Sequence, residues 1–78
     1  SFSQTTTVKG TVLDEKGEPI PYARVRFSGT KIGTLTDTVG AFFLQSYYAT
    51  DSIQVQFIGF KTQSIKIKKD VEQSLKIQ

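Results

Sequence analysis

Apolar side chains recur at every second residue in short segments of this chain, and clusters rich in Gly, Pro and Asp separate the segments. A period of two is typical of β-strands with one buried and one solvated face. No window carries the three- and four-residue apolar spacing of an amphipathic helix. The pattern therefore predicts a chain that folds entirely as β-strands.

Seven segments carry the alternation, and each of them predicts one strand. Their expected ranges are 6–13, 22–28, 33–36, 41–45, 52–58, 60–68 and 73–78. The side chains expected to point inward are Val8, Val12, Ala23, Val25, Phe27, Phe42, Leu44, Ile53, Val55, Phe57, Ile65, Ile67, Leu75 and Ile77. Because one flat sheet could not bury both apolar sets, we expect a seven-stranded antiparallel β-sandwich of two sheets packed face to face.

The turns between these segments are expected to rest on a few Asp and Gly residues. Asp14 and Gly17 predict a hairpin between the first two strands, because Asp accepts hydrogen bonds from the following backbone and Gly takes positive φ without strain. Asp37 and Gly40 predict a second tight turn in the same way, and Gly59 is expected to bend or break a strand. We interpret all five as structural residues.

The length of 78 residues supports one domain, spanning residues 1–78, with residues 1–6 expected to be flexible. Its thin core would rely on the large side chains of six Phe and three Tyr residues. No segment is long and apolar enough to span a membrane, so direct membrane insertion by this chain is not expected.

The sequence lacks Cys, His, Met and Trp altogether. Disulfides are therefore excluded, as are the usual zinc, haem and iron–sulfur ligands and the Ser–His and Cys–His nucleophile pairs. The seven acidic residues fall mostly in turns, where solvated charges explain them better than a catalytic pair does. We expect no catalytic residue, no cofactor and no enzyme activity.

Calcium is the one metal that the remaining oxygen ligands could favour, through Asp37 or Asp51. Capping of turn backbone explains Asp37 more simply, and the chain has no D-x-D-x-D array. We therefore assign no metal site, and the sequence does not decide whether Asp37 or Asp51 contacts calcium.

Two surfaces are candidates for binding. Tyr47 and Tyr48 lie in an expected loop and could form an aromatic platform for a partner protein or a sugar, although we expect at least one ring to cap the end of the sandwich. Ten basic residues against seven acidic ones could favour nucleic acid, but they are spread along the chain. A basic stripe of Arg24, Arg26, Lys66 and Lys68 would form only if their strands share a sheet, and we expect no nucleic-acid binding.

Three blocks carry a family resemblance: VKGTVLDEKGEPIPYA at 8–23, GTKIGTLTDTVGAF at 29–42 and FIGF at 57–60. Together they resemble the carboxypeptidase regulatory-like domain, whose fold is a transthyretin-like (prealbumin-like) β-sandwich. The resemblance runs from about Val8 to Ile77. Two positions depart from the family pattern: Tyr22, where Gly or Ala is frequent, and Phe60, where Tyr is usual.

The resemblance implies a non-catalytic accessory domain, of the kind found at the N-terminus of Bacteroidetes outer-membrane proteins such as TonB-dependent receptors. It implies export to the periplasm or the outer membrane. The expected partner is protein, either the same parent chain or a member of a complex, and an exposed sheet edge could bind it by strand addition. The alternative is a small carbohydrate-binding module that uses Tyr47 and Tyr48.

Overall fold

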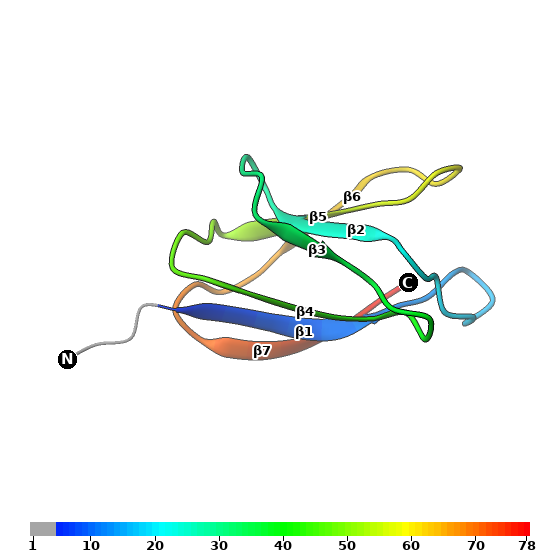
Figure 1. The fold of residues 1–78 in the computed structure, drawn as a ribbon, viewed down its shortest axis with the longest axis horizontal. Coiled ribbons are helices and arrows are strands. Elements are labelled where there is room, and N and C mark those ends of the chain that lie inside the picture. The colour runs from blue at the N-terminus through cyan, green and yellow to red at the C-terminus, as the bar shows by residue number, and fades with distance from the viewer. Residues whose placement is uncertain (1–4) are drawn as a thin grey trace.

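The computed structural model describes residues 5–78, which form seven β-strands and no helix. The strands are β1 (Thr6–Val12), β2 (Arg24–Phe27), β3 (Gly33–Leu35), β4 (Ala41–Ser46), β5 (Ser52–Gln56), β6 (Gln63–Lys66) and β7 (Glu72–Ile77). They form a three-stranded sheet in the order β4-β1-β7 and a four-stranded sheet in the order β3-β2-β5-β6. Figure 1 shows the two sheets as layers, so the predicted two-sheet β-sandwich is confirmed.

The core lies between the two sheets and consists of side chains that the alternation places inward, together with Ile20 from the connection between β1 and β2. In β2, Val25 and Phe27 are fully buried while Arg24 is exposed. The other buried apolar residues are Val8, Val12, Ile20, Ala23, Phe42, Leu44, Ile53, Val55, Ile67 and Ile77. Phe57, Ile65 and Leu75, also predicted to point inward, are only partly buried against this core.

One strand pairing departs from the expected antiparallel arrangement. β7 pairs with β1 in parallel, with Thr7 opposite Glu72 and Val12 opposite Ile77. The other pairings, β1 with β4 and those of the four-stranded sheet, are antiparallel. The parallel pairing arises because the chain leaves β6 in one sheet and enters β7 in the other at the end where β1 begins.

The predicted hairpin between the first two strands is wrong, although its turn forms. β1 and β2 belong to different sheets, and only an isolated bridge between Leu13 and Pro19 extends the turn. The chain then crosses between the layers at Ile20, which is buried. The apolar side chain of Ile20 therefore anchors the crossing segment in the core between the two sheets. A hairpin would instead have placed β2 beside β1 in one sheet.

Asp14 and Asp37 build two turns of the same design. Asp14 Oδ1 accepts hydrogen bonds from Lys16 N (2.8 Å) and Glu18 N (2.9 Å). Asp37 Oδ1 accepts them from the equivalent positions, Val39 N (3.0 Å) and Ala41 N (2.9 Å). Each turn also has a glycine with positive φ, 84° at residue 17 and 76° at residue 40. Both turns join strands of different sheets, so this motif forms the corners of the sandwich.

The start of β1 is anchored by contacts from the far end of the chain. Thr6, which the sequence places in a flexible segment, is 1% exposed and its Oγ1 accepts a hydrogen bond from Asp70 N at 2.7 Å. Residues 1–4 of that segment lie outside the described residues. Within residues 5–78 there is no helix long and apolar enough to cross a membrane.

Candidate functional site

The two loop tyrosines predicted as a contact site project from the β4–β5 connection. Tyr47 is 67% exposed and Tyr48 is 78% exposed, so the expectation that one ring caps the sandwich is wrong. The connection is held by its polar groups: Ser46 Oγ accepts a hydrogen bond from Tyr48 N at 2.9 Å, and Thr50 Oγ1 donates to Ser28 O at 3.0 Å. The rings are thus free to contact another molecule.

The carboxylates do not converge anywhere in the part of the chain that the structure describes. No group of three or more Asp, Glu, His or Cys side chains within residues 5–78 is placed to hold a metal ion. One oxygen of Asp37 accepts two backbone hydrogen bonds, and Asp51 is an exposed residue at the start of β5. The structure therefore does not bring Asp37 and Asp51 together with other acidic groups.

The outer face of the four-stranded sheet carries basic residues from two of its strands. β2 and β6 lie on either side of β5. Arg24, Arg26 and Lys66 therefore belong to the same sheet, which is the condition for the basic stripe. Arg26 Nη2 donates to Gln54 Oε1 at 3.1 Å, whereas Arg26 Nε is buried with no hydrogen-bond partner among the described residues. Lys68 follows the end of β6, so the stripe is shorter than the sequence indicates.

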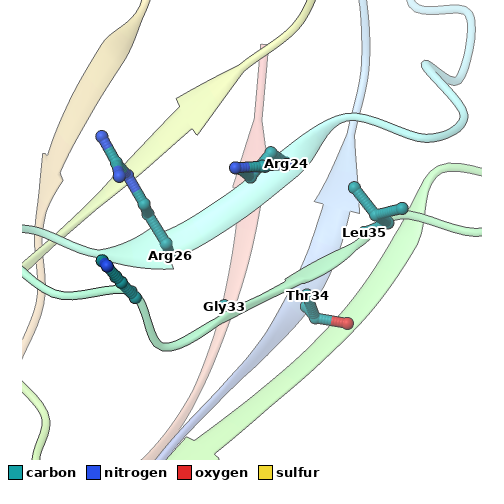
Figure 2. A pocket seen from close by; sticks show the side chains of 6 residues that line it. Arg24, Arg26, Gly33, Thr34 and Leu35 are labelled. Carbon is teal, nitrogen blue, oxygen red and sulfur yellow. The ribbon is translucent and has the colours of Figure 1, made fainter.

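A first hollow on this face lies over β2 and β3. Figure 2 shows the side chains of Arg24 and Arg26 leaving β2 and that of Leu35 leaving β3, with Thr34 pointing away from Leu35. A side chain at Gly33 would fill the floor, because its Cβ would lie 2.7 Å from Arg26 Cβ. Lys31 completes the lining, so every charged residue in this hollow is a cation.

A second hollow continues from the first and shares Arg24 and Leu35 with it. Apolar side chains dominate its rim: Tyr22, Leu35, Phe57, Ile58 and Phe60. Gln56 and Thr62 supply neutral polar groups, and Arg24 is its single charged residue. The two hollows together form one continuous surface with an apolar part and a basic part.

The apolar rim is exposed because of how the β5–β6 connection folds. Phe60 N donates to Phe57 O at 3.0 Å, and Gly59 takes a φ of 88°, which places Ile58 at the tip of a tight turn. The rings of Phe57 and Phe60 pack at a centroid distance of 5.6 Å and support the turn. Ile58 itself is 93% exposed, an unusual position for an aliphatic side chain next to other apolar groups.

Tyr22 joins this rim in a strained backbone conformation. Its φ of 62° lies in the left-handed region, which costs a residue with a Cβ about 1–2 kcal/mol. Its N–H donates to Thr36 O at 3.0 Å, which fixes the backbone in place. The ring is 61% exposed, so burial of the side chain offsets little of that cost.

Sequence reasoning missed this apolar rim. The signal was present at Leu35, an apolar residue between two threonines on the face opposite to the core, and in the FIGF block. Neither pattern shows that Tyr22, Leu35 and Phe60 line one hollow, because the segments that carry them become neighbours only when β3 and β5 pair with β2. The site is therefore a product of the sheet order.

The free edge of β7 offers a different kind of surface. β1 pairs with only one side of β7, and Leu13 N donates to Ile77 O at 2.7 Å on that side. Alternate residues of a strand turn their backbone groups to opposite sides, so the odd-numbered residues face β1. The residues whose N–H and C=O groups face the free edge are Glu72, Ser74 and Lys76.

Comparison with known proteins gives consistent matches. The sequence profile of the CarboxypepD_reg-like domain matches residues 8–78. The TonB-dependent receptor SusC of Bacteroides thetaiotaomicron is 41% identical over 76 residues, which cover 97% of this chain and 8% of that receptor. The TonB-dependent receptor P39 of Formosa agariphila is 36% identical over 68 residues, covering 87% of this chain and 7% of the receptor. The chain thus spans less than a tenth of the length of either relative.

Proposed function

Because the chain belongs to the CarboxypepD_reg-like domain family, we propose that it is a non-catalytic accessory domain of a larger, exported protein of the outer membrane. The two TonB-dependent receptors that it resembles support this proposal, since the matching region makes up 7–8% of each. A domain of this kind would form a single β-sandwich within residues 1–78 and contribute contacts to the longer protein.

The residues available for chemistry support a role without catalysis. The chain has no His or Cys, and the carboxylates of Asp14 and Asp37 accept backbone hydrogen bonds in turns. The two hollows are lined by cations, apolar groups and neutral polar groups, and no acidic residue lies in either lining to activate a nucleophile. Binding is the activity that such surfaces favour.

The observation that most strongly supports a protein partner is the free edge of β7. Three residues of a six-residue strand, Glu72, Ser74 and Lys76, direct backbone groups away from β1. An extended segment of another protein could add to this edge and satisfy these groups with main-chain hydrogen bonds. β6, the edge of the other sheet on this side, is only four residues long and offers a shorter template.

Substituting proline for Ser74 tests this route without disrupting the native pairing. The Ser74 N–H faces the free edge, so Ser74→Pro removes a hydrogen-bond donor for an added strand while the bonds to β1 remain. We expect the urea midpoint of the domain to change little. We also expect the longer protein to lose assembly or transport activity, as we expect for deletion of residues 1–78.

The matched control is Ser64→Pro on β6. By the antiparallel pairing of Ile65 with Ile53, the Ser64 N–H also faces a free edge, but on the four-stranded sheet. Ser64→Pro should leave assembly and transport intact. Normal assembly of the Ser74→Pro protein would rule out strand addition at β7, and normal assembly after deletion of the whole domain would rule out the accessory role.

A carbohydrate-binding module is the second candidate, and the exposure of Tyr47 and Tyr48 favours it. Two aromatic rings on one connection can stack against sugar rings. Calorimetric titration of the domain with a broad polysaccharide panel separates the two functions. Binding that disappears in a Tyr47→Ala/Tyr48→Ala protein would support the sugar function, and absence of binding across the panel would remove it.

A further inference from the structure

The joined hollows on the four-stranded sheet form a surface that we name the Arg24 patch. Its members are Tyr22, Arg24, Arg26, Lys31, Leu35, Ile58 and Phe60. It lies on the face of the sheet, whereas strand addition would use the edge of the other sheet. Figure 1 places the β5–β6 tip at the end of the sandwich opposite the β4–β5 connection, so the apolar part of the patch is separate from Tyr47 and Tyr48, whereas the β2–β3 connection, which carries Lys31, lies at the same end as the β4–β5 connection.

The charge of the patch is uncompensated. Arg24, Arg26 and Lys31 line it, and no acidic residue lines either hollow. Within residues 5–78 the ion pair that forms, Lys9 Nζ to Glu72 Oε2 at 3.0 Å, lies on the other sheet. A ligand for this surface should therefore carry negative charge.

The apolar half of the patch calls for apolar groups in the same ligand. Ile58 and Tyr22 are exposed at 93% and 61%, and Leu35 and Phe60 lie with them around Arg24. Contiguous apolar side chains bordered by cations form anchor pockets in protein interfaces, where aromatic residues and arginine supply much of the binding free energy. Nucleic acid would engage a more extended basic surface, and a sugar would leave the cations without partners.

The strained backbone of Tyr22 gives the patch a further distinguishing feature. A glycine would adopt the φ of 62° without strain, yet the chain carries a large ring that remains mostly in solvent. The ring is therefore not explained by the stability of the fold. Its position on the rim next to Arg24 fits a role in binding.

We propose that the Arg24 patch binds an extended segment of a partner protein in which carboxylate side chains adjoin aliphatic or aromatic ones. The carboxylates would pair with Arg24 and Lys31, and an apolar side chain would sit between Tyr22, Leu35 and Phe60. The inference rests on the proposed function only in that the partner is a protein, because it uses a surface that strand addition leaves open.

Titration of the 78-residue domain with synthetic peptides tests the proposal directly. The probe is a short peptide in which Glu and Asp alternate with Leu and Trp, and the comparison peptide has Lys in place of every acid. In ¹⁵N NMR spectra we expect the acidic peptide to shift the resonances of residues in the Arg24 patch, and added salt to weaken its binding. The Lys peptide should bind at least about tenfold more weakly.

Two variants distinguish the patch from other surfaces. Arg24→Glu should weaken binding of the acidic peptide by about tenfold or more, because it replaces attraction by repulsion. Tyr22→Gly should weaken it several-fold while the urea midpoint stays the same or rises, since the strain is relieved. The matched controls, Lys69→Glu with the same reversal of charge and Tyr48→Gly with the same loss of a ring, lie elsewhere on the surface and should leave binding unchanged.

The outcomes separate this inference from the function proposed above. Equal binding of the two peptides, absence of binding, or equal effects of Arg24→Glu and Lys69→Glu would overturn the inference. The inference would also be overturned if a polysaccharide, and not the acidic peptide, shifted the resonances of residues in the patch. None of these experiments involves the β7 edge. The Ser74→Pro result can therefore contradict strand addition while the acidic peptide still binds, or support strand addition while the peptide does not bind.

Discussion

Alanine at position 10 is expected to destabilise the domain by about 3 kcal/mol or more, at the upper end of the cost of overpacking. Gly10 lies in β1, the central strand of the three-stranded sheet. A Cβ at this position would collide with the carbonyl oxygen of Leu75 in β7 and would lie 2.9 Å from the Leu75 carbonyl carbon. The colliding atoms belong to the backbone, so no rotamer change of a side chain can relieve the contact.

Urea unfolding of Gly10→Ala beside Gly29→Ala measures this effect. Gly29 has a φ of 78° but open space around the position of its Cβ, so its substitution adds only backbone strain of about 1 kcal/mol. The free energy of unfolding should fall substantially more for Gly10→Ala. Equal losses for the two variants would mean that β7 does not approach β1 as closely as described.

Replacing Thr36 by valine is expected to cost about 2–4 kcal/mol, because two buried backbone groups would lose their partner. Thr36 is 1% exposed. Its Oγ1 donates to Ile20 O at 2.7 Å and accepts from Ala23 N at 2.8 Å, and thereby joins the crossing segment to the end of β3. Valine has nearly the same shape, so the change isolates the hydroxyl group.

Thr36→Ser is the matched control, since it keeps the hydroxyl and removes only a methyl group. We expect it to cost about 1 kcal/mol, the value of one buried methyl group. Thermal or urea unfolding of both proteins gives the comparison. If valine were tolerated as well as serine, the hydroxyl would not be what holds the crossing segment at Ile20 and Ala23.

The local pattern of the sequence predicts the strands well, because apolar residues alternate along each strand and form its buried face. In β2, exposed Arg24 precedes buried Val25, and the same alternation places Ile53 and Val55 of β5 in the core. The burial of each of these residues can therefore be predicted from a window of a few neighbouring residues.

Pairing direction and sheet order do not follow from such local patterns. Leu75 and Ile77 would alternate in the same way in a parallel or an antiparallel strand, so the parallel pairing of β7 could not be predicted from its residues. The turn at Asp14 is equally ambiguous, because the hydrogen bonds of Asp14 are the same whether the following strand returns beside β1 or crosses to the other sheet.

The candidate site also combines features that follow from the local sequence with features that depend on the sheet order. The exposure of Tyr47 and Tyr48 follows from their place in a connection, although the capping of the sandwich by one ring does not occur. The Arg24 patch could not be predicted, because only the sheet order brings its parts together. Leu35 lies in β3, whereas Tyr22 precedes β2 and Phe60 lies in the β5–β6 connection. Its sequence signals are Leu35, an apolar residue at an outward-facing strand position, and the FIGF block at 57–60.

The central claim is that this domain contacts protein through the Arg24 patch, and photo-crosslinking in the longer protein tests it most directly. A photoreactive amino acid at Leu35, which lies in the Arg24 patch, is compared with one at Val39, which is similarly exposed but lines neither hollow. We predict a discrete protein adduct from position 35 and none from position 39. The absence of any protein adduct from position 35, or equal adducts from both positions, would contradict the claim.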